Sequence, residues 1–422
     1  MLNIEFLPIL LDNLGLYILD LCLIALLFFV ITKKLLISII NPLTTGFIAI
    51  VFADTVPLFL YQLGLMPWHR FHFIIACELS FWICFFLFKK KSYSFYYIKN
   101  EKRILKKFFN ICFGSVILYY GCLYSIAGAG LFMSNRFDMY EGHSLLQLLS
   151  KFILLPNLFC HLYAYHMFHL KKKKKAVLIF TILSVLSFLS GAKSSIIILL
   201  TSYFLYRHFY LSEEIKIPKW IFVVIPIFPI LTIIIGQGSN GIEAFGELAF
   251  RFVKFGDVYW MSMTDNTLDE LVVKSPVRYI LNPFLKLFNL GEEHREAFGN
   301  LILAELHPGY EGVQGGPNAR CPVTSYILFQ DYGFVFAGIC GLFASFLAFG
   351  IRRYIPDGLI GTAIYGMFYT LCLQPATDPL GMWQILLILC FEIYIIRLIF
   401  LVFYKVKIVK NEHENINCSC CV

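Results

Sequence analysis

Apolar runs of membrane-spanning length recur along this chain, and they constrain its fold more than any other feature of the sequence. A transmembrane helix needs about 20 consecutive, mostly apolar residues. Runs that approach or reach this length fall at 14–32, 44–66, 70–88, 108–132, 145–169, 176–191, 195–210, 220–236, 326–350, 358–377 and 380–404. Hydrophobic residues make up 59% of the chain and charged residues 15%, whereas soluble domains have about 45–50% and about 25%. The sequence therefore predicts an all-α polytopic membrane protein with about eleven transmembrane helices.

Basic residues gather at the ends of these apolar runs, and their positions indicate an orientation. The net charge is +8, and the basic clusters lie at 33–34, 89–91, 171–175 and 352–353. Cytoplasmic loops of membrane proteins carry an excess of Lys and Arg, so we expect Lys91, Lys173 and Arg353 in the cytoplasm, the N-terminus outside and the C-terminus inside. The basic clusters do not alternate with aromatic residues as a base-stacking surface does. The predicted partner is thus the lipid bilayer and not nucleic acid.

One long polar segment, residues 237–320, interrupts the predicted spans. In this orientation it is a large extracytoplasmic loop within a single integral membrane domain that comprises residues 1–422. Glu243, Glu247, Arg251 and Lys254 are spaced so that they share one face of a helix. This amphipathic helix either lies on the membrane with its charges in water or covers a cavity with its charges turned toward a substrate.

A short hairpin between two apolar runs contains Lys193 and Ser194. The flanking runs have only about 15 or 16 residues, fewer than a straight span needs, so we expect the turn to be recessed below the outer surface. Non-helical backbone at membrane depth must be buried in protein or line a wet cavity. A lysine with hydroxyl groups there suits the phosphates of a lipid-linked pyrophosphate. The alternative is a lysine at a helix end whose side chain reaches the interface.

The first outer loop of any length contains a cation and two carboxylates, Arg136, Asp138 and Glu141. These groups could bind sugar hydroxyls or phosphate, and Asp138 is an acid–base candidate, although a polar connecting loop has the same composition. The loop has no Asp-x-Asp pair, and no other cluster in the sequence has the spacing of a catalytic zinc or magnesium site. The sequence therefore predicts neither a metal nor a cofactor.

A Gly- and Pro-rich stretch concentrates polar residues where the long loop meets the next predicted span. It contains Glu305, His307, Asn318 and Arg320. Glu305 and His307 are acid–base candidates, and Asn318 and Arg320 are candidate donors to a substrate. The alternative is a polar loop that packs against itself.

Carboxylates also fall inside predicted spans, at Asp20, Asp54, Glu78 and Glu392. A carboxylate at mid-bilayer costs about 2.5–3.5 kcal/mol on insertion scales. Each of them is therefore either paired inside the helix bundle or functional. Asp54 and Glu78 lie near the middle of consecutive antiparallel spans, so they could share a proton.

The stretch from Gly315 to Gly350 resembles the C-terminal region of Wzy-type oligosaccharide repeat-unit polymerases. That region typically has an Asn, then Pro-Thr-Ser, and then Phe-Gly before a helix. The matching residues here are Pro317-Asn318, Pro322-Val-Thr324-Ser325-Tyr326, Asp331-Tyr332-Gly333-Phe334 and Phe349-Gly350. Other stretches that are similar to the family are Asn41-Pro42-Leu43, Arg251 to Tyr259, His307-Pro308 and the hairpin Gly191-Ala-Lys193-Ser194-Ser195, which has Lys where the family usually has Arg.

The resemblance implies a GT-C-like, metal-independent glycosyltransferase of the bacterial inner membrane. Such an enzyme polymerises undecaprenyl-pyrophosphate-linked repeat units into O-antigen or capsular polysaccharide at the outer face, with a chain-length regulator membrane protein as a candidate partner. One lipid pyrophosphate would lie against Lys193 and one of the outer arginines, Arg136, Arg251 or Arg320. A carboxylate or His307 would take the proton of the acceptor hydroxyl, while the cations stabilise the departing pyrophosphate.

Two other functions stay open. An O-antigen ligase, or another GT-C transferase of lipid-linked sugars, would share the donor and the topology but use lipid A core or another acceptor. A lipid-linked oligosaccharide flippase or other transporter is the non-enzymatic alternative. A transporter of this kind is expected to show internal halves and no long outer loop, and this sequence has a long outer segment and no repeated halves.

Overall fold

The structure is a computed structural model of the 422-residue chain. It describes residues 3–35, 37–87, 94–133, 138–140, 143–191, 195–215, 230–231, 233–234, 246, 250–264, 267–287, 298–306, 317–403 and 408–410. The chain divides into two compact units. Unit 1 comprises Met1–Lys89, Ser239–Phe346 and Leu371–Ile385, and unit 2 comprises Lys90–Gly238, Leu347–Thr370 and Leu386–Val422.

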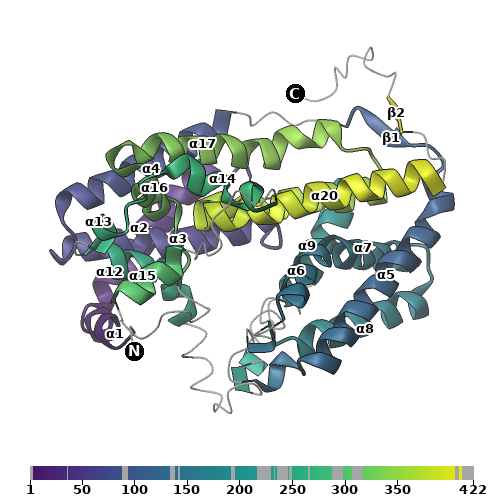
Figure 1. The fold of residues 1–422 in the computed structure, drawn as a ribbon, viewed down its shortest axis with the longest axis horizontal. Coiled ribbons are helices and arrows are strands. Elements are labelled where there is room, and N and C mark those ends of the chain that lie inside the picture. Colours follow the sequence, from purple (N-terminus) through teal and green to yellow (C-terminus); the bar gives the residue numbers. More distant parts are fainter. Residues whose placement is uncertain are drawn as a thin grey trace. The chain divides into compact units, whose positions relative to one another are not determined.

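Helices dominate the described residues (Figure 1), and seven of these helical stretches are long and apolar enough to cross a membrane. They are Leu14–Thr32, Pro42–Gln62, Trp68–Leu87, Glu101–Phe132, Leu145–His169, Cys321–Tyr354 and Pro379–Leu398. The predicted all-α class is confirmed, and the seven helices agree with a multi-pass membrane protein. The predicted runs at 176–191, 195–210 and 358–377 form helical segments shorter than a straight span. The run at 220–236 lies almost entirely outside the described residues.

Unit 1 contains two packed helix pairs, α2 with α3 and α4 with α17. Its described elements are α1 (Asn3–Asp12), α2 (Leu14–Thr32), α3 (Pro42–Gln62), α4 (Trp68–Leu87), η4 (Lys254–Gly256), α12 (Asp257–Met263), α13 (Thr267–Glu270), α14 (Pro276–Leu287), α15 (Phe298–Leu306), α16 (Cys321–Phe329), η5 (Gln330–Tyr332), α17 (Gly333–Ser345) and α19 (Gln374–Thr377). The helix α20 (Pro379–Phe403) begins in unit 1 and continues in unit 2, as does the π-helical segment η6 (Phe346–Gly350).

Small residues and a side-chain cap explain how these helices form and pack. Asn41 caps α3, because its Oδ1 accepts a hydrogen bond from the Leu43 amide at 3.1 Å and Pro42 occupies the first turn. A Cβ at Gly341 of α17 would collide with the backbone of Phe81 on α4. Glycine at this position therefore lets the two helix backbones approach closely, which is how membrane helices commonly associate.

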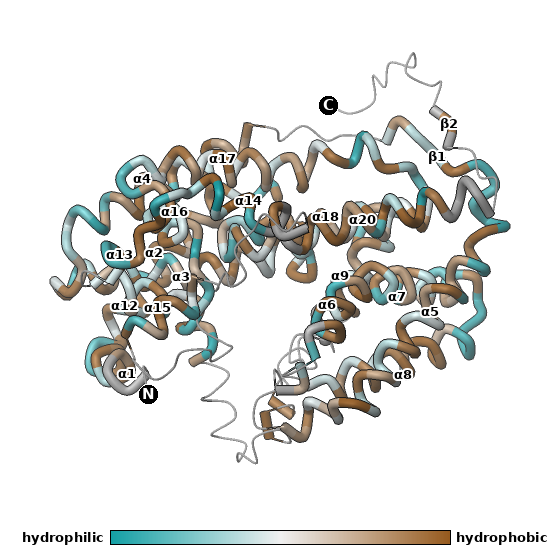
Figure 2. The backbone as a smooth tube through the Cα atoms, in the orientation of Figure 1, coloured by the Kyte–Doolittle hydropathy of each residue, from teal (hydrophilic) through white to brown (hydrophobic). Residues whose placement is uncertain are grey.

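Unit 2 consists mainly of helices, with one small sheet. Its described elements are β1 (Tyr96–Ile98), α5 (Glu101–Ile126), η1 (Gly130–Phe132), η2 (Asp138–Tyr140), α6 (Ser144–Phe152), α7 (Leu154–His169), α8 (Lys173–Leu189), α9 (Ser195–Leu205), η3 (Tyr206–Tyr210), η7 (Ile351–Tyr354), α18 (Leu359–Leu371) and β2 (Ile408–Lys410). Hydrophobic residues run along α8 (Figure 2), and its Val177, Leu178 and Val185 are more than half exposed. An apolar surface of this kind suits contact with lipid.

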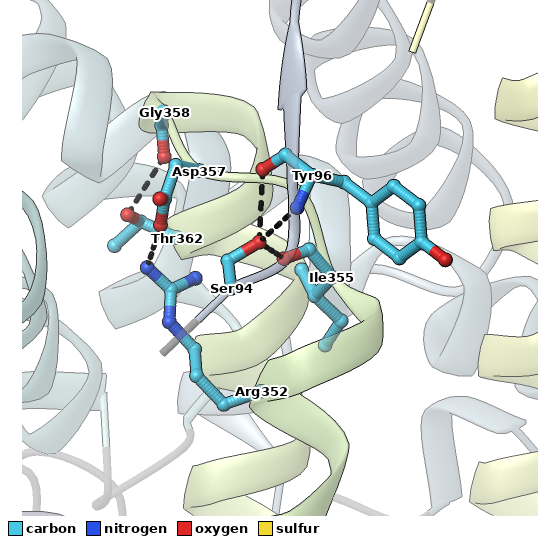
Figure 3. Close-up of polar contacts among 7 residues, drawn as sticks. All are labelled: Ser94, Tyr96, Arg352, Ile355, Asp357, Gly358 and Thr362. Atoms are coloured by element: carbon cyan, nitrogen blue, oxygen red, sulfur yellow. Dashed lines mark hydrogen bonds and ion pairs between the residues drawn. The ribbon is translucent and has the colours of Figure 1, made fainter. Parts of the chain in front are cut away.

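A polar network joins the segment before β1 to the loop that follows η7 (Figure 3). The Ser94 hydroxyl donates a hydrogen bond to the Ile355 carbonyl oxygen at 2.5 Å and accepts one from the Tyr96 amide at 3.1 Å. Arg352 of η7 pairs with Asp357 of this loop at 2.6 Å. The strands β1 and β2 are antiparallel, with Tyr97 opposite Val409. These bonds connect the two strands with the loop that follows η7.

Candidate functional site

Arg320 directly precedes α16 and lies in the interior of unit 1. Arg320 is only 2% exposed, although Asn318, two residues earlier, is exposed. A tight turn produces this change, because the Arg320 amide donates to the Asn318 carbonyl and the Thr324 hydroxyl donates to the Ala319 carbonyl at 2.6 Å. The Arg320 Nη2 atom then donates to the Ala49 carbonyl of α3 at 3.1 Å. The turn therefore directs a predicted binding residue toward the membrane-spanning helices.

Two carboxyl groups from neighbouring helices interact electrostatically with this cation. Asp54 lies on α3 and Glu78 lies on α4, and both interact electrostatically with the Arg320 guanidinium and with each other. Glu78 also accepts a hydrogen bond from the Trp82 indole at 3.0 Å. The sequence predicts that each intramembrane acid is paired or functional. In the structure, Asp54 and Glu78 both interact with the same cation, Arg320. Whether the two acids share a proton stays a prediction.

The cluster has polar atoms that lack partners. Asp54 Oδ1, Arg320 Nε and the Tyr259 hydroxyl are buried and have no hydrogen-bond partner within the described part of the chain. Tyr259 lies on α12, is fully buried, and interacts electrostatically with Asp54, Glu78 and Arg320. Buried polar groups are nearly always hydrogen-bonded, so unpaired atoms in one cluster indicate capacity to bind a further polar group or water.

Asp257 adds a titratable group at the start of α12. Burial raises the pKa of this carboxyl to about 7, and the Val258 amide and the charges of Lys254 and Arg320 oppose the rise. The preceding Gly256 packs against α3, since a Cβ there would lie 2.6 Å from the Ala53 carbonyl oxygen. This close approach brings Asp257 to the same helix that carries Asp54. A carboxyl with a pKa near neutrality can exchange a proton at physiological pH.

Burial also raises the pKa of the Tyr259 phenol, and the negative charges of Asp54 and Glu78 add to the effect. The phenol therefore keeps its proton at neutral pH and is available as a hydrogen-bond donor. Together, the site contains a fixed cation in Arg320, a donor in Tyr259 and three carboxyl groups. Such a set can hold an anionic group and accept a proton beside it.

Other predicted site residues lie elsewhere in unit 1. Arg251 is partly buried in the helical turn before η4, and Asn318 is exposed. Glu305 is exposed on α15, where a hydrogen bond with the carboxyl of Glu270 raises its pKa. The structure thus brings Arg320 together with the intramembrane acids but leaves Glu305 at the surface.

Five predicted site residues have side chains outside the described residues. Lys193, Ser194, Arg136 and His307 lie outside the described residues, and Asp138 begins η2 with a side chain outside them. Their assigned roles stay predictions, as do the extracytoplasmic position of residues 237–320 and the single membrane domain of 1–422.

Sequence reasoning overlooked Asp257 and Tyr259 as site residues. A signal was available, because the Arg251 to Tyr259 helix is one of the stretches that resemble the polymerase family. The amphipathic pattern emphasised Arg251 and Lys254 instead, since they continue the row of charges from Glu243.

No protein-family model, no curated protein and no solved structure matches this chain. A function for it therefore has to rest on the chemistry of its own residues. The groups that carry this chemistry are Arg320, Asp257, Tyr259, Asp54 and Glu78.

Proposed function

We propose that this protein is a glycosyltransferase that polymerises undecaprenyl-pyrophosphate-linked oligosaccharide repeat units into O-antigen or capsular polysaccharide. The single observation that carries the proposal is the position of Arg320. This residue belongs to the stretch with the family resemblance, and it lies buried beside carboxyl groups from α3, α4 and the start of α12. Transfer of a glycan from a lipid pyrophosphate needs such a cation for the leaving group and a nearby base for the acceptor.

In the proposed reaction, the acceptor hydroxyl oxygen of one lipid-linked repeat unit attacks the anomeric carbon of the growing glycan. The bond between that carbon and the pyrophosphate oxygen breaks, and its electron pair leaves with the lipid pyrophosphate. Asp257 takes the proton of the hydroxyl, because its pKa of about 7 leaves much of it ionised at neutral pH. Arg320 and the Tyr259 hydroxyl stabilise the charge that develops on the departing pyrophosphate.

The proposal includes the finer topology that the resemblance implies. The chain would have about eleven spans in a GT-C-like arrangement, with the N-terminus and residues 237–320 outside the bacterial inner membrane. Lys193, Ser194, Arg136, Arg251 and Asn318 are proposed as further contacts to the phosphates and sugars. Glu305, His307 and Asp138 are alternative bases.

One observation favours a second candidate function, a transporter or flippase of lipid-linked oligosaccharide. Asp54 and Glu78 lie inside candidate membrane spans and face an arginine. Ionisable residues in such positions often form proton relays in transporters. A ligase, which transfers the glycan to another acceptor, would use the same site as the polymerase.

Reconstituted protein distinguishes these functions. Purified protein in liposomes receives an undecaprenyl-pyrophosphate-linked repeat unit, and the readouts are released undecaprenyl pyrophosphate and glycans longer than one unit. We expect the wild-type protein to yield both products. Asp257→Asn should lower the rate about 100-fold or more, because a general base contributes about 10²–10⁴-fold. The exposed acid of η5 provides the matched control, and Asp331→Asn should leave the rate unchanged.

The pH dependence supplies a further test of the base. The wild-type rate should rise with pH through about 7, as the Asp257 carboxyl loses its proton, and this rise should be absent from the residual rate of Asp257→Asn. Movement of the lipid-linked unit across the bilayer without release of pyrophosphate would establish the transporter and exclude the polymerase.

A further inference from the structure

A cavity of about 210 Å³ lies among helices of unit 2. Its walls come from α5, α6, α7 and α20, and most of the lining residues are apolar, including Phe108, Phe152, Leu155 and Ile395. An apolar cavity of about 150 Å³ already accepts a benzene-sized ligand. The space in unit 2 is therefore large enough for a compact organic molecule.

The cavity contains one ionisable acid. Glu392 of α20 lines it and is only 9% exposed. Within the described residues, this carboxyl has no hydrogen-bond partner and no ion pair, and no basic side chain acts on it electrostatically. A buried acid without a partner is unfavourable in an apolar setting, so a ligand that supplies a positive charge there gains an interaction that the protein does not provide.

The other polar groups in the cavity do not satisfy Glu392. The Ser115 hydroxyl donates to the Ile111 carbonyl of its own helix at 2.9 Å, and Cys112 is a free thiol. The lining residues Ile111 and Ile395 are exposed by 45% and 37%. A ligand can therefore enter from the surface of unit 2 without opening the core.

We propose that this cavity binds an amphiphile with a compact apolar body and an ammonium group, and that Glu392 pairs with the ammonium. The apolar walls from α5, α6, α7 and α20 select the body, and the single carboxylate selects the charge, which is the usual division of roles in small-molecule sites. An anion would meet repulsion from Glu392, and a sugar would find few polar partners. The inference is independent of the glycosyltransferase proposal.

The test compares two probes of the same shape, 1-adamantanamine, which is positively charged at pH 7, and the neutral 1-adamantanol. Calorimetric titration into the purified full-length protein in nanodiscs measures both affinities. We expect wild-type protein to bind the amine at least tenfold more tightly than the alcohol, because a hydrogen bond to a charged group exceeds a neutral one by about this factor. Equal affinities, or the absence of saturable binding of the amine, would overturn the proposal.

Variants assign the binding to this cavity. Glu392→Gln should lower the affinity for the amine about tenfold or more and leave that for the alcohol nearly unchanged. Ser115→Phe should weaken both probes, since its ring occupies the space of the apolar body. Glu213→Gln, which removes an acid from an ion pair elsewhere in unit 2, should leave both affinities unchanged. An amine affinity that survives both Glu392→Gln and Ser115→Phe would place the binding elsewhere and refute the inference.

Discussion

Each unit contains a site with a buried acid, and the two sites differ in how its charge is balanced. In unit 1, the carboxylates of Asp54 and Glu78 share the buried cation Arg320. In unit 2, the buried acid Glu392 stands in an apolar cavity without a partner among the described residues. The acids of both sites lie in candidate membrane spans, so the difference arises from which helices meet and not from the surrounding solvent.

In unit 1 the protein itself balances the buried charges, whereas in unit 2 the charge of Glu392 is left for a ligand to balance. Removing one of several interacting buried charges leaves the others with an uncompensated desolvation cost. Removing a solitary acid exposes nothing, because no partner loses its interaction. The stability of the two units should therefore respond very differently to single substitutions.

The largest effect is expected from Arg320→Ala. Two carboxylates would lose their cation, and breaking a buried charge pair costs on the order of 3–5 kcal/mol. The readout is the melting temperature of purified protein in detergent, with Arg353→Ala, an exposed arginine, as the matched control. Adding Asp54→Asn to Arg320→Ala should recover part of the loss, because one stranded charge is removed. If Arg320→Ala and Arg353→Ala had the same small effect, the contrast between the units would fail.

An intermediate effect is expected at the partly exposed ion pairs. In unit 1, Asp269 accepts hydrogen bonds from Arg70 at 2.8 Å and from the Tyr326 hydroxyl at 2.7 Å. Burial alone would raise the pKa of Asp269, but these two bonds outweigh it and lower the pKa. Asp269→Asn should cost about 1–2 kcal/mol at neutral pH, a value reduced by screening at the exposed carboxylate.

The corresponding pair of unit 2 should contribute less. Burial raises the pKa of Asp357, and the Arg352 charge offsets this only in part, so the fold does not favour the ionised form. Asp357→Asn should change the stability at neutral pH by less than about 1 kcal/mol.

The pH dependence of stability distinguishes Asp269 from Asp357. The contribution of Asp269 is present above its unfolded pKa of about 3.9 and is lost as the pH falls through its lower folded pKa. The cost of ionising Asp357 instead begins above about pH 3.9 and grows until the pH passes its raised folded pKa. Melting temperatures measured from pH 7 down to pH 3 should therefore show the Asp269→Asn effect shrinking only at the acid end. A larger loss from Asp357→Asn than from Asp269→Asn at pH 7 would contradict the proposed order.

The smallest effect is expected from Glu392→Gln. The amide has nearly the same shape as the acid, and no partner of Glu392 is lost, so the substitution should destabilise the protein by less than about 0.5 kcal/mol. The same detergent melting experiment measures it, without any added amphiphile. A loss above about 2 kcal/mol would mean that Glu392 has a structural partner, and the two units would no longer differ in kind.

Much of the fold class could be predicted from the sequence, because helices that contact lipid require local runs of apolar residues. Each candidate span of the structure coincides largely with an apolar run, and the acids at Asp54, Glu78 and Glu392 were recognisable as exceptions inside such runs. Arg320 was also recognisable, since it lies in a polar stretch that enters a span. These features depend on composition over about 20 residues and need no knowledge of which helices touch.

Only the tertiary structure decided which of these residues meet. Arg320 lies far along the chain from Asp54 and Glu78, and helices that are apolar on all sides carry little signal about the face that packs inward. Close packing of η4 on α3 at Gly256 brings Asp257 into the site, and its raised pKa follows from that burial. The cavity at Glu392 likewise exists because four helices leave a space between them. The membrane-spanning segments follow from local runs of apolar residues. The pairing of charges instead depends on which helix faces are in contact, and the surrounding lipid does not determine those faces.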